Sequence, residues 1–449
     1  MSNSQPPIDD TIDLLIHAGW VVPIVPHAEA LEAHSVAISD GEIKAILPRD
    51  QALTLSASET VDLPQHAVMP GLVNGHGHAA MSLLRGYADD HPLMPWLEDH
   101  IWPAEGAHVS HEFVRDGVDL AALEMIRSGT TTFSDMYFFP EACADSVKDS
   151  GLRCQMSIPI IGFPTAWAGG ADECISKGLA LRDDRKHQPR LTVVFGPHAI
   201  YTVPEDALQR VSTLAAELDL PIQIHLHETR GEVLQAVEER GERPIDTLAR
   251  LGLIGPRSQC VHMTDLGTQD IALLADHGAH VVHCPHSNMK LASGACPVSK
   301  LVEAGVNVAL GTDSAASNNN LNLFEEMHTA ALLAKLVSED ATALPAADLL
   351  MMATLNGAKA LGLDHLVGSI EPGKRADLIA VDLSGPETQP LYNPLSQLAY
   401  ACNGSQVIHS WVDGNALMKN RALTTLNEAA VLERAAQWQT RIAGTGASA

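Results

Sequence analysis

The sequence has little of what membrane and secreted proteins need. Apolar residues make up 46% of its 449 residues, yet no unbroken apolar run is long enough to span a bilayer. The first fifteen residues hold three aspartates and no lysine or arginine, so the basic start of a secretory signal peptide is missing. The seven cysteines are dispersed and form no Cys-x-x-Cys pair, a pattern typical of reduced thiols. We therefore expect a cytoplasmic protein that does not enter the membrane.

Basic residues are also scarce. Lysine and arginine number 28 against 55 aspartates and glutamates, and the formal net charge is −27. Proteins that bind nucleic acid need a basic surface to neutralise phosphates, so nucleic acid is excluded as the expected partner. The acidity favours solubility and says nothing about a substrate.

The middle of the chain alternates apolar strand-like runs with helical stretches, the pattern of repeated βα units. The predicted strands are 68–74, 130–135, 153–159, 191–197, 222–225, 259–262, 279–284 and 306–312. Eight such units over roughly 250 residues have the size of a (β/α)8 TIM barrel. Catalytic groups of that fold lie at the carboxyl ends of the strands, which is where polar residues fall here. Between two of these strands, Thr202 and Glu205 predict a capping box that opens a helix toward Glu217.

Shorter strands lie on both sides of the barrel segment. Those before it are 12–18, 20–24, 34–39 and 42–47, with breaks at Gly19 and at the Asp40-Gly41 turn. Those after it are 377–381 and 406–412. We predict that both groups meet in one small β-sandwich with the barrel inserted between them. The expected units are residues 1–66 for the first part of the sandwich, 67–365 for the catalytic barrel, and 366–449 for the second part plus a terminal helix.

His76 and His78 directly follow the first predicted barrel strand. Residues i and i+2 of a strand point to the same face, so these imidazoles can bind one metal ion together. His225 and His227 end the fifth strand with the same parity, and spacing alone leaves open which of them binds. We favour His225, because Glu228 could then reach over the metal. With Asp313 after the eighth strand, three imidazoles, one carboxylate and a water would form a zinc-like catalytic site.

These motifs resemble those of the amidohydrolase superfamily. The residues that carry the resemblance are His76-x-His78, His225-x-x-Glu228, His262 after an apolar strand, and Asp313-Ser314. Within the superfamily, the chain resembles the methylthioadenosine/S-adenosylhomocysteine deaminases over residues 10 to 420. That closer likeness comes from the runs 70–78, 81–86, 196–198 and 311–318 together with Trp96.

The resemblance implies a metal site and its catalytic groups. His76, His78, His225 and Asp313 would hold one divalent ion per chain, usually Zn²⁺, with another ion such as Fe²⁺ as the alternative. Asp313 would also accept a proton from the attacking water, Glu228 would transfer the proton, and His262 would hold or polarise the water. Binuclear relatives place a carboxylated lysine at the end of the fourth strand. This chain has His198 there and its nearest lysine is Lys186, so a single ion is expected.

The resemblance also implies how a substrate is bound. Glu105 would contact the ribose hydroxyls, His198 the nucleoside, and Trp96 and Met81 would line the pocket. The family further uses arginines between the third and fourth strands to hold the substrate. Here the segment 162–170 contains none, so the group that binds the substrate's tail is left open.

The implied activity is hydrolytic deamination of an aminopurine nucleoside to its inosine analogue and ammonia. Methylthioadenosine, S-adenosylhomocysteine and adenosine are the candidate substrates, and the superfamily suggests a homo-oligomer, either a dimer or a tetramer. Two enzyme alternatives use the same metal site: a guanine- or cytosine-type deaminase and a triazine-type chlorohydrolase or aminohydrolase. A non-catalytic scaffold is the remote alternative from another class.

Overall fold

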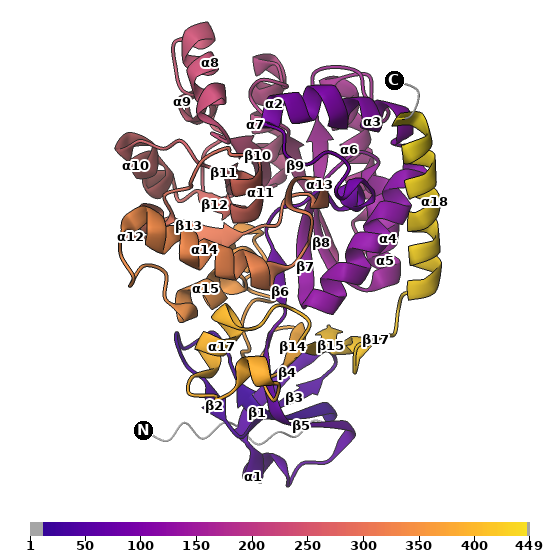
Figure 1. The fold of residues 1–449 in the computed structure, drawn as a ribbon, viewed down its shortest axis with the longest axis vertical. Helices are drawn as coiled ribbons and strands as arrows, with labels where there is room; N and C mark the ends of the chain where they lie inside the picture. Colours follow the sequence, from indigo (N-terminus) through magenta and orange to yellow (C-terminus); the bar gives the residue numbers. More distant parts are fainter. Residues whose placement is uncertain (1–11, 447–449) are drawn as a thin grey trace.

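In the computed structural model, which describes residues 12–446, the chain forms two sheets surrounded by helices (Figure 1). The first eleven residues of the predicted unit 1–66 and the last three of the unit 366–449 lie outside the described residues. Within the described part, no helix combines the length and apolar composition that crossing a membrane requires.

One sheet is a parallel barrel of eight strands that follow one another in chain order. This confirms the predicted TIM barrel, because strands covered by helices are buried on both faces and read as continuous apolar runs. The strands are β6 (Leu72–Asn74), β7 (Thr130–Met136), β8 (Arg153–Ile160), β9 (Leu191–Pro197), β10 (Ile222–Leu226), β11 (Ser258–His262), β12 (His280–His283) and β13 (Asn307–Leu310).

Helices follow the strands and cover the outside of the barrel (Figure 1). The longer ones are α4 (His111–Ser128), α5 (Pro140–Ser150), α6 (Ala171–Arg185), α7 (Glu205–Leu218), α8 (Arg230–Arg240), α10 (Thr268–His277) and α14 (Leu323–Ser338). The shorter ones are α9 (Pro244–Arg250), α11 (Pro285–Lys290), α12 (Val298–Glu303), α13 (Ala315–Asn318), α15 (Ala346–Met352) and α16 (Leu355–Ala360). The segment after β6 forms η1 (Ala79–Leu84), α2 (Leu93–Trp96), η2 (Leu97–Ile101) and α3 (Trp102–His108). Figure 1 shows α2 and α3 over the upper end of the barrel.

The predicted capping box before α7 is wrong. The helix begins at Glu205 after Pro204, and no side chain caps it. The Thr202 hydroxyl instead donates to the carbonyl of Ala199 and lies 2.9 Å from Nδ1 of His198. The short side chain is therefore used to hold a residue of the candidate site rather than the helix end.

The second sheet has nine strands and joins both ends of the chain in the small β-sandwich domain. Its strands are β1 (Ile12–Val21), β2 (Leu31–Glu32), β3 (His34–Ser39), β4 (Glu42–Pro48), β5 (Ala57–Pro70), β14 (Leu378–Asp382), β15 (Val407–Val412), β16 (Asn415–Lys419) and β17 (Ala422–Leu423). Short helices α1 (Arg49–Ala52), η3 (Pro386–Thr388) and α17 (Pro394–Tyr400) accompany it. The two halves meet where β14 pairs with β5.

The predicted strands differ from the structure at two places. The run 68–74 is divided, because residues up to Pro70 belong to β5 of the second sheet and only Leu72–Asn74 enter the barrel. The break expected at Gly19 does not occur, and β1 continues to Val21 with a change of register between Ala18 and Trp20.

The barrel closes at the residues that follow its first and last strands. The amide of Gly75 donates to the carbonyl of Leu310 at 2.8 Å, and the amide of Asp313 donates to the carbonyl of His76 at 3.1 Å. The closing seam therefore runs directly through the candidate metal ligands.

The C-terminal helix α18 (Glu428–Gly446) packs against α4 of the barrel rather than against the second sheet (Figure 1). The Trp438 indole N–H donates to the Asp116 carboxylate at 2.9 Å, and its ring meets the Phe113 ring edge-on. The second sheet is held to the barrel at another place, where Arg153 on β8 pairs with Asp377 at 2.9 Å.

Candidate active site

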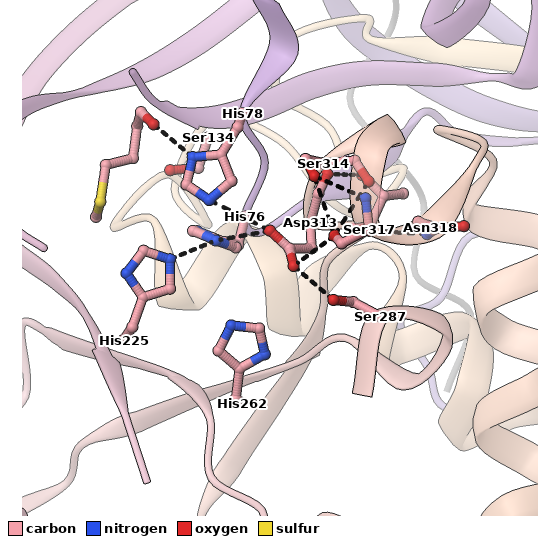
Figure 2. Close-up of polar contacts among 12 residues, drawn as sticks. His76, His78, Ser134, His225, His262, Ser287, Asp313, Ser314, Ser317 and Asn318 are labelled. Carbon is pink, nitrogen blue, oxygen red and sulfur yellow. Dashed lines mark hydrogen bonds and ion pairs between the residues drawn. The ribbon is translucent and has the colours of Figure 1, made fainter. Parts of the chain in front are cut away.

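Three imidazoles and one carboxylate meet at the carboxyl end of the barrel (Figure 2). The Nε2 atoms of His76 and His225 are 3.2 Å apart. Oδ1 of Asp313 lies 3.5 Å from Nε2 of His76 and 3.2 Å from Nε2 of His78. The three histidines bring their ligand atoms within 4.8 Å of one another, the spacing of a group that can hold a metal ion.

Each of these histidines has its outer nitrogen engaged by an oxygen atom of the protein. Nδ1 of His76 lies 2.9 Å from Oε1 of Gln223, Nδ1 of His78 lies 2.5 Å from the carbonyl of Met136, and Nδ1 of His225 lies 2.7 Å from the carbonyl of His198. An acceptor at Nδ1 holds a proton there and leaves Nε2 as the nitrogen directed inward. This is the arrangement that orients imidazole ligands around a metal.

Gln223 is itself held in one orientation by its neighbours. Its amide nitrogen donates to Oε1 of Gln259 at 2.7 Å and to the carbonyl of Gly75 at 3.0 Å. The amide oxygen is therefore the atom that faces His76. Gln223 and Gln259 are fully buried, so these hydrogen bonds fix the position of the His76 ring.

Asp313 is held in the same way on its outer oxygen. Oδ2 accepts hydrogen bonds from the hydroxyls of Ser287 at 2.6 Å and Ser317 at 2.9 Å, which leaves Oδ1 facing the histidines (Figure 2). Burial alone would raise the pKa of the Asp313 carboxyl, but the contacts to His76 and His78 hold that pKa well below its ordinary value. The group is therefore a carboxylate at neutral pH.

His225, and not His227, faces the other candidate ligands. Nδ1 of His227 lies 2.9 Å from the carbonyl of Asp265, and its Nε2 accepts the amide N–H of Ile245 at 3.2 Å. Burial, with the nearby positive charge of Arg243, lowers the pKa of His227 to about 4. A neutral ring with both nitrogens already engaged has no atom left for a metal.

Glu228 is buried beside this group. Burial, reinforced by the negative charge of Asp313, raises the pKa of its carboxyl to about 8. It therefore carries a proton at neutral pH and can donate it. The Glu228 amide donates at 2.7 Å to the carboxylate of Glu232, which anchors the turn after β10.

His262 completes the inner end of the site. Its Nδ1 lies 2.9 Å from Oδ1 of Asn288, and its Nε2 lies 3.8 Å from Oε2 of Glu228. Burial lowers the pKa of the ring. A neutral His262 with its proton on Nδ1 presents Nε2 as an acceptor toward the site. Figure 2 shows the His262 ring below His76 and Asp313.

A cavity of about 480 Å³ opens above these groups. Glu105 and Tyr137 lie in its wall, and the Tyr137 hydroxyl donates to Oε1 of Glu105 at 2.6 Å. Burial raises the pKa of Glu105 to about 7, although the bond from Tyr137 opposes that change. Glu105 is thus a partly buried hydrogen-bonding group in the cavity wall and not a surface carboxylate.

The remaining predicted residues also line the cavity. His198 has its Nδ1 engaged by the Thr202 hydroxyl, and burial, with the charges of His78 and His76, lowers its pKa to about 3. The neutral ring thus has one nitrogen left for a substrate. Trp96 and Met81 are each 5% exposed and form part of the apolar wall of the cavity.

Sequence reasoning missed the residues that hold the site in place, among them Gln223, Asn288, Ser287 and Tyr137. Gln223 had a signal, because it is a polar residue inside an otherwise apolar barrel strand. The other three lie beyond strand ends, and their partners are distant in sequence, so no local pattern pointed to them.

A TIM barrel with clustered histidines and an aspartate at its carboxyl end defines the class of metal-dependent hydrolase barrels. The model of the Amidohydrolase family matches residues 67–417, and the chain belongs to that family. The superfamily resemblance is thereby confirmed.

The similar proteins have more specific names. The chain is 51% identical over 433 residues to a 5-methylthioadenosine/S-adenosylhomocysteine deaminase of Teredinibacter turnerae, covering 96% of this chain and 98% of that one. It is 44% identical to a 5'-deoxyadenosine deaminase of Methanosarcina mazei, with 94% and 96% covered. Among solved structures, an adenosine deaminase from Xanthomonas campestris with bound zinc is 50% identical, with a TM-score of 0.96 over 98% of this chain and 100% of that one.

Proposed function

We propose that the protein is a zinc-dependent deaminase that hydrolyses an adenine nucleoside to the inosine analogue and ammonia. The observation that carries the proposal is the convergence of three inward Nε2 atoms and Asp313 Oδ1 at the base of a cavity that also holds a protonated Glu228. The relatives named as deaminases of adenine nucleosides support it.

The donor set fits zinc. Imidazole nitrogens and one carboxylate oxygen are ligands that Zn²⁺ accepts in catalytic sites, which keep a further position for water. His76, His78, His225 and Asp313 would hold the ion, and their outer atoms are already engaged by protein groups. When bound, the ion supplies Lewis acidity that lowers the pKa of water to about 7.

The surrounding residues supply the proton transfers. The Asp313 carboxylate can accept a proton from the attacking water, and Nε2 of His262 can accept a hydrogen bond from the same water. The protonated Glu228 can donate its proton to the ring nitrogen beside the carbon that is attacked. The proton held by Asp313 can then pass to the amino group, which leaves as ammonia when the C–N bond breaks, and the hydroxyl proton left on the ring carbon can return to Glu228. Proton transfer by a positioned side chain typically contributes about 10²–10⁴-fold to the rate.

The rest of the cavity would position the nucleoside. We assign the ribose hydroxyls to Glu105, a carboxyl group in the cavity wall whose oxygens can accept hydrogen bonds. His198 would contact the nucleoside through its remaining nitrogen, and Trp96 and Met81 would pack against it. A volume of about 480 Å³ suits a ligand of this size.

Two further assignments belong to the proposal. We infer that the protein is cytoplasmic, supported by seven cysteines that are all buried and free.

We also infer a homo-oligomer, either a dimer or a tetramer, for which light scattering of the purified protein is the direct measurement. Elution and scattering as a monomer at working concentrations would contradict it.

The activity is tested with a panel of substrates and zinc-loaded protein. Ammonia release and the absorbance change of deamination should occur with methylthioadenosine, 5'-deoxyadenosine or adenosine. Activity on guanine, cytosine or a chlorotriazine with none on adenosine analogues would favour the alternative hydrolases. Protein that is purified gently and binds no metal would instead revive the non-catalytic scaffold.

A further inference from the structure

The outer part of the cavity is lined by apolar side chains. Ile161, Phe163, Pro164 and Ala166 come from the loop after β8, and Leu97 comes from η2. Phe163 is 45% exposed, whereas His76 at the inner end is fully buried. The loop therefore lies at the mouth of the cavity, and the proposed metal site lies at its base.

This arrangement orients a nucleoside. If the base reacts at the metal site and the ribose meets Glu105, the 5' substituent of the ribose extends toward the mouth. The segment that it then meets is the loop 161–166, whose one polar side chain, Thr165, has its hydroxyl oxygen bonded to the amides of Trp167 and Ala168.

The cavity wall has no cation to balance a charged substituent. Among the described residues that line it, three are carboxylic acids, Glu105, Glu228 and Asp313, and none is lysine or arginine. The loop does contact Lys177, but that ammonium donates to the Trp167 carbonyl at 2.5 Å and pairs with Glu173 at 2.7 Å. Lys177 is not part of the cavity wall.

We propose that the cavity selects adenine nucleosides with an uncharged apolar 5' substituent and discriminates against the zwitterionic amino-acid tail of S-adenosylhomocysteine. This rests on the proposed deaminase function and specifies its substrate class. A methylthio or alkylthio group packs on the loop, whereas a carboxylate placed there loses part of its hydration and gains no positive partner.

The test separates charge from length with three substrates. Methylthioadenosine has a short apolar tail, and S-butylthioadenosine has the chain length of the homocysteine tail without its charges. With zinc-loaded enzyme, kcat/KM for S-butylthioadenosine should be within about tenfold of that for methylthioadenosine. The value for S-adenosylhomocysteine should be about 100-fold below the butyl compound, which is less than a fully buried unpaired charge costs because the mouth is partly exposed. A ratio below about tenfold overturns the inference.

Two matched variants test the location of the subsite. Ala166→Arg supplies a cation at the loop and should raise the ratio of S-adenosylhomocysteine to S-butylthioadenosine by about tenfold. Ala166→Met adds length without charge and should leave that ratio unchanged. Phe163→Arg is the second cationic variant if Ala166→Arg does not fold. A ratio that neither arginine raises overturns the placement of the tail.

The outcomes also distinguish this inference from the function on which it rests. Equal use of S-adenosylhomocysteine and S-butylthioadenosine overturns the selectivity and leaves the deaminase assignment intact. Zinc-loaded protein that releases ammonia from none of the three nucleosides overturns the proposed function, and the selectivity with it.

Discussion

Replacing Glu228 by glutamine keeps the size of the side chain but removes the proton that it can transfer. The residue is 7% exposed, and burial with the charge of Asp313 keeps its carboxyl protonated up to a pH of about 8. Its carboxyl oxygen Oε2 lies 3.8 Å from Nε2 of His262, and it is not one of the clustered metal ligands. Glu228→Gln should therefore retain zinc while losing proton transfer.

The expected loss follows from the role assigned to the side chain. A positioned general acid is worth about 10²–10⁴ in rate, which corresponds to about 3–5 kcal/mol of transition-state stabilisation. Turnover of zinc-loaded Glu228→Gln on methylthioadenosine should fall by this factor, with metal content measured on the same sample. Glu238→Gln makes the same chemical change on the exposed face of α8 and should keep full activity.

The pH profile gives an independent check. The active form of Glu228 is the protonated one, so kcat/KM should fall as the pH rises through about 8, and a decrease at lower pH belongs to ionisation of the attacking water and not to Glu228. The residual activity of Glu228→Gln should lack the alkaline decrease. Full activity of the zinc-loaded glutamine variant, or an unchanged alkaline limb in it, would refute the assignment.

The other predictions concern the packing of the two sheets and the support of the metal ligands. Arg153→Met should lower the free energy of unfolding, followed in urea, by about 3–5 kcal/mol, because it leaves Asp377 buried without its partner and removes the 2.8 Å contact to Asp413. Gln223→Leu should weaken zinc binding by about 10–100-fold, measured by competition with a chelator, because Nδ1 of His76 loses its acceptor.

Each of these variants has a matched control. Arg182→Met removes an exposed pair with Asp183 and should change stability by less than about 1 kcal/mol. Gln235→Leu changes an exposed glutamine on α8 and should leave zinc affinity unaltered. Equal effects of Arg153→Met and its control would mean that the pairing between the sheets contributes nothing. Normal zinc affinity in Gln223→Leu would mean that His76 needs no acceptor to be oriented.

Most of the barrel could be predicted because its strands are apolar runs that end in polar residues. The strands of the second sheet are harder to predict from the sequence. β5 contains Pro64 and several exposed polar residues, so its fourteen residues show no strand-like alternation. Gly19 was interpreted as a break although it marks a change of register, since a Cβ there would lie 2.4 Å from the carbonyl oxygen of Pro64. Local sequence does not distinguish these two uses of glycine.

The predicted site residues all lie at one end of the barrel, but sequence could not say how each is held. The choice between His225 and His227 depends on Asp265 and Ile245, which contact His227 only after folding. The protonation of Glu228 likewise comes from burial by elements far apart in the chain. Residue types and strand position indicated the chemistry, and tertiary contacts determine which atoms are free to carry it out.

Closure of the barrel and construction of the metal site depend on the same contacts, and Asn74 tests that connection. Its amide nitrogen donates to the Thr312 hydroxyl at 2.7 Å and its amide oxygen accepts the Thr312 amide at 3.0 Å, so it joins the end of β6 to the end of β13. Asn74→Ala removes both bonds next to His76 and Asp313 and should lower the stability of metal-free protein by about 1–3 kcal/mol. Zinc affinity should fall as well, because the ligands on the two sides of the seam are then less well oriented. Asn415→Ala, at an exposed position on β16, is the control for both measurements. A variant that is less stable but binds zinc as tightly as the parent would show that the seam stabilises the barrel without orienting the ligands.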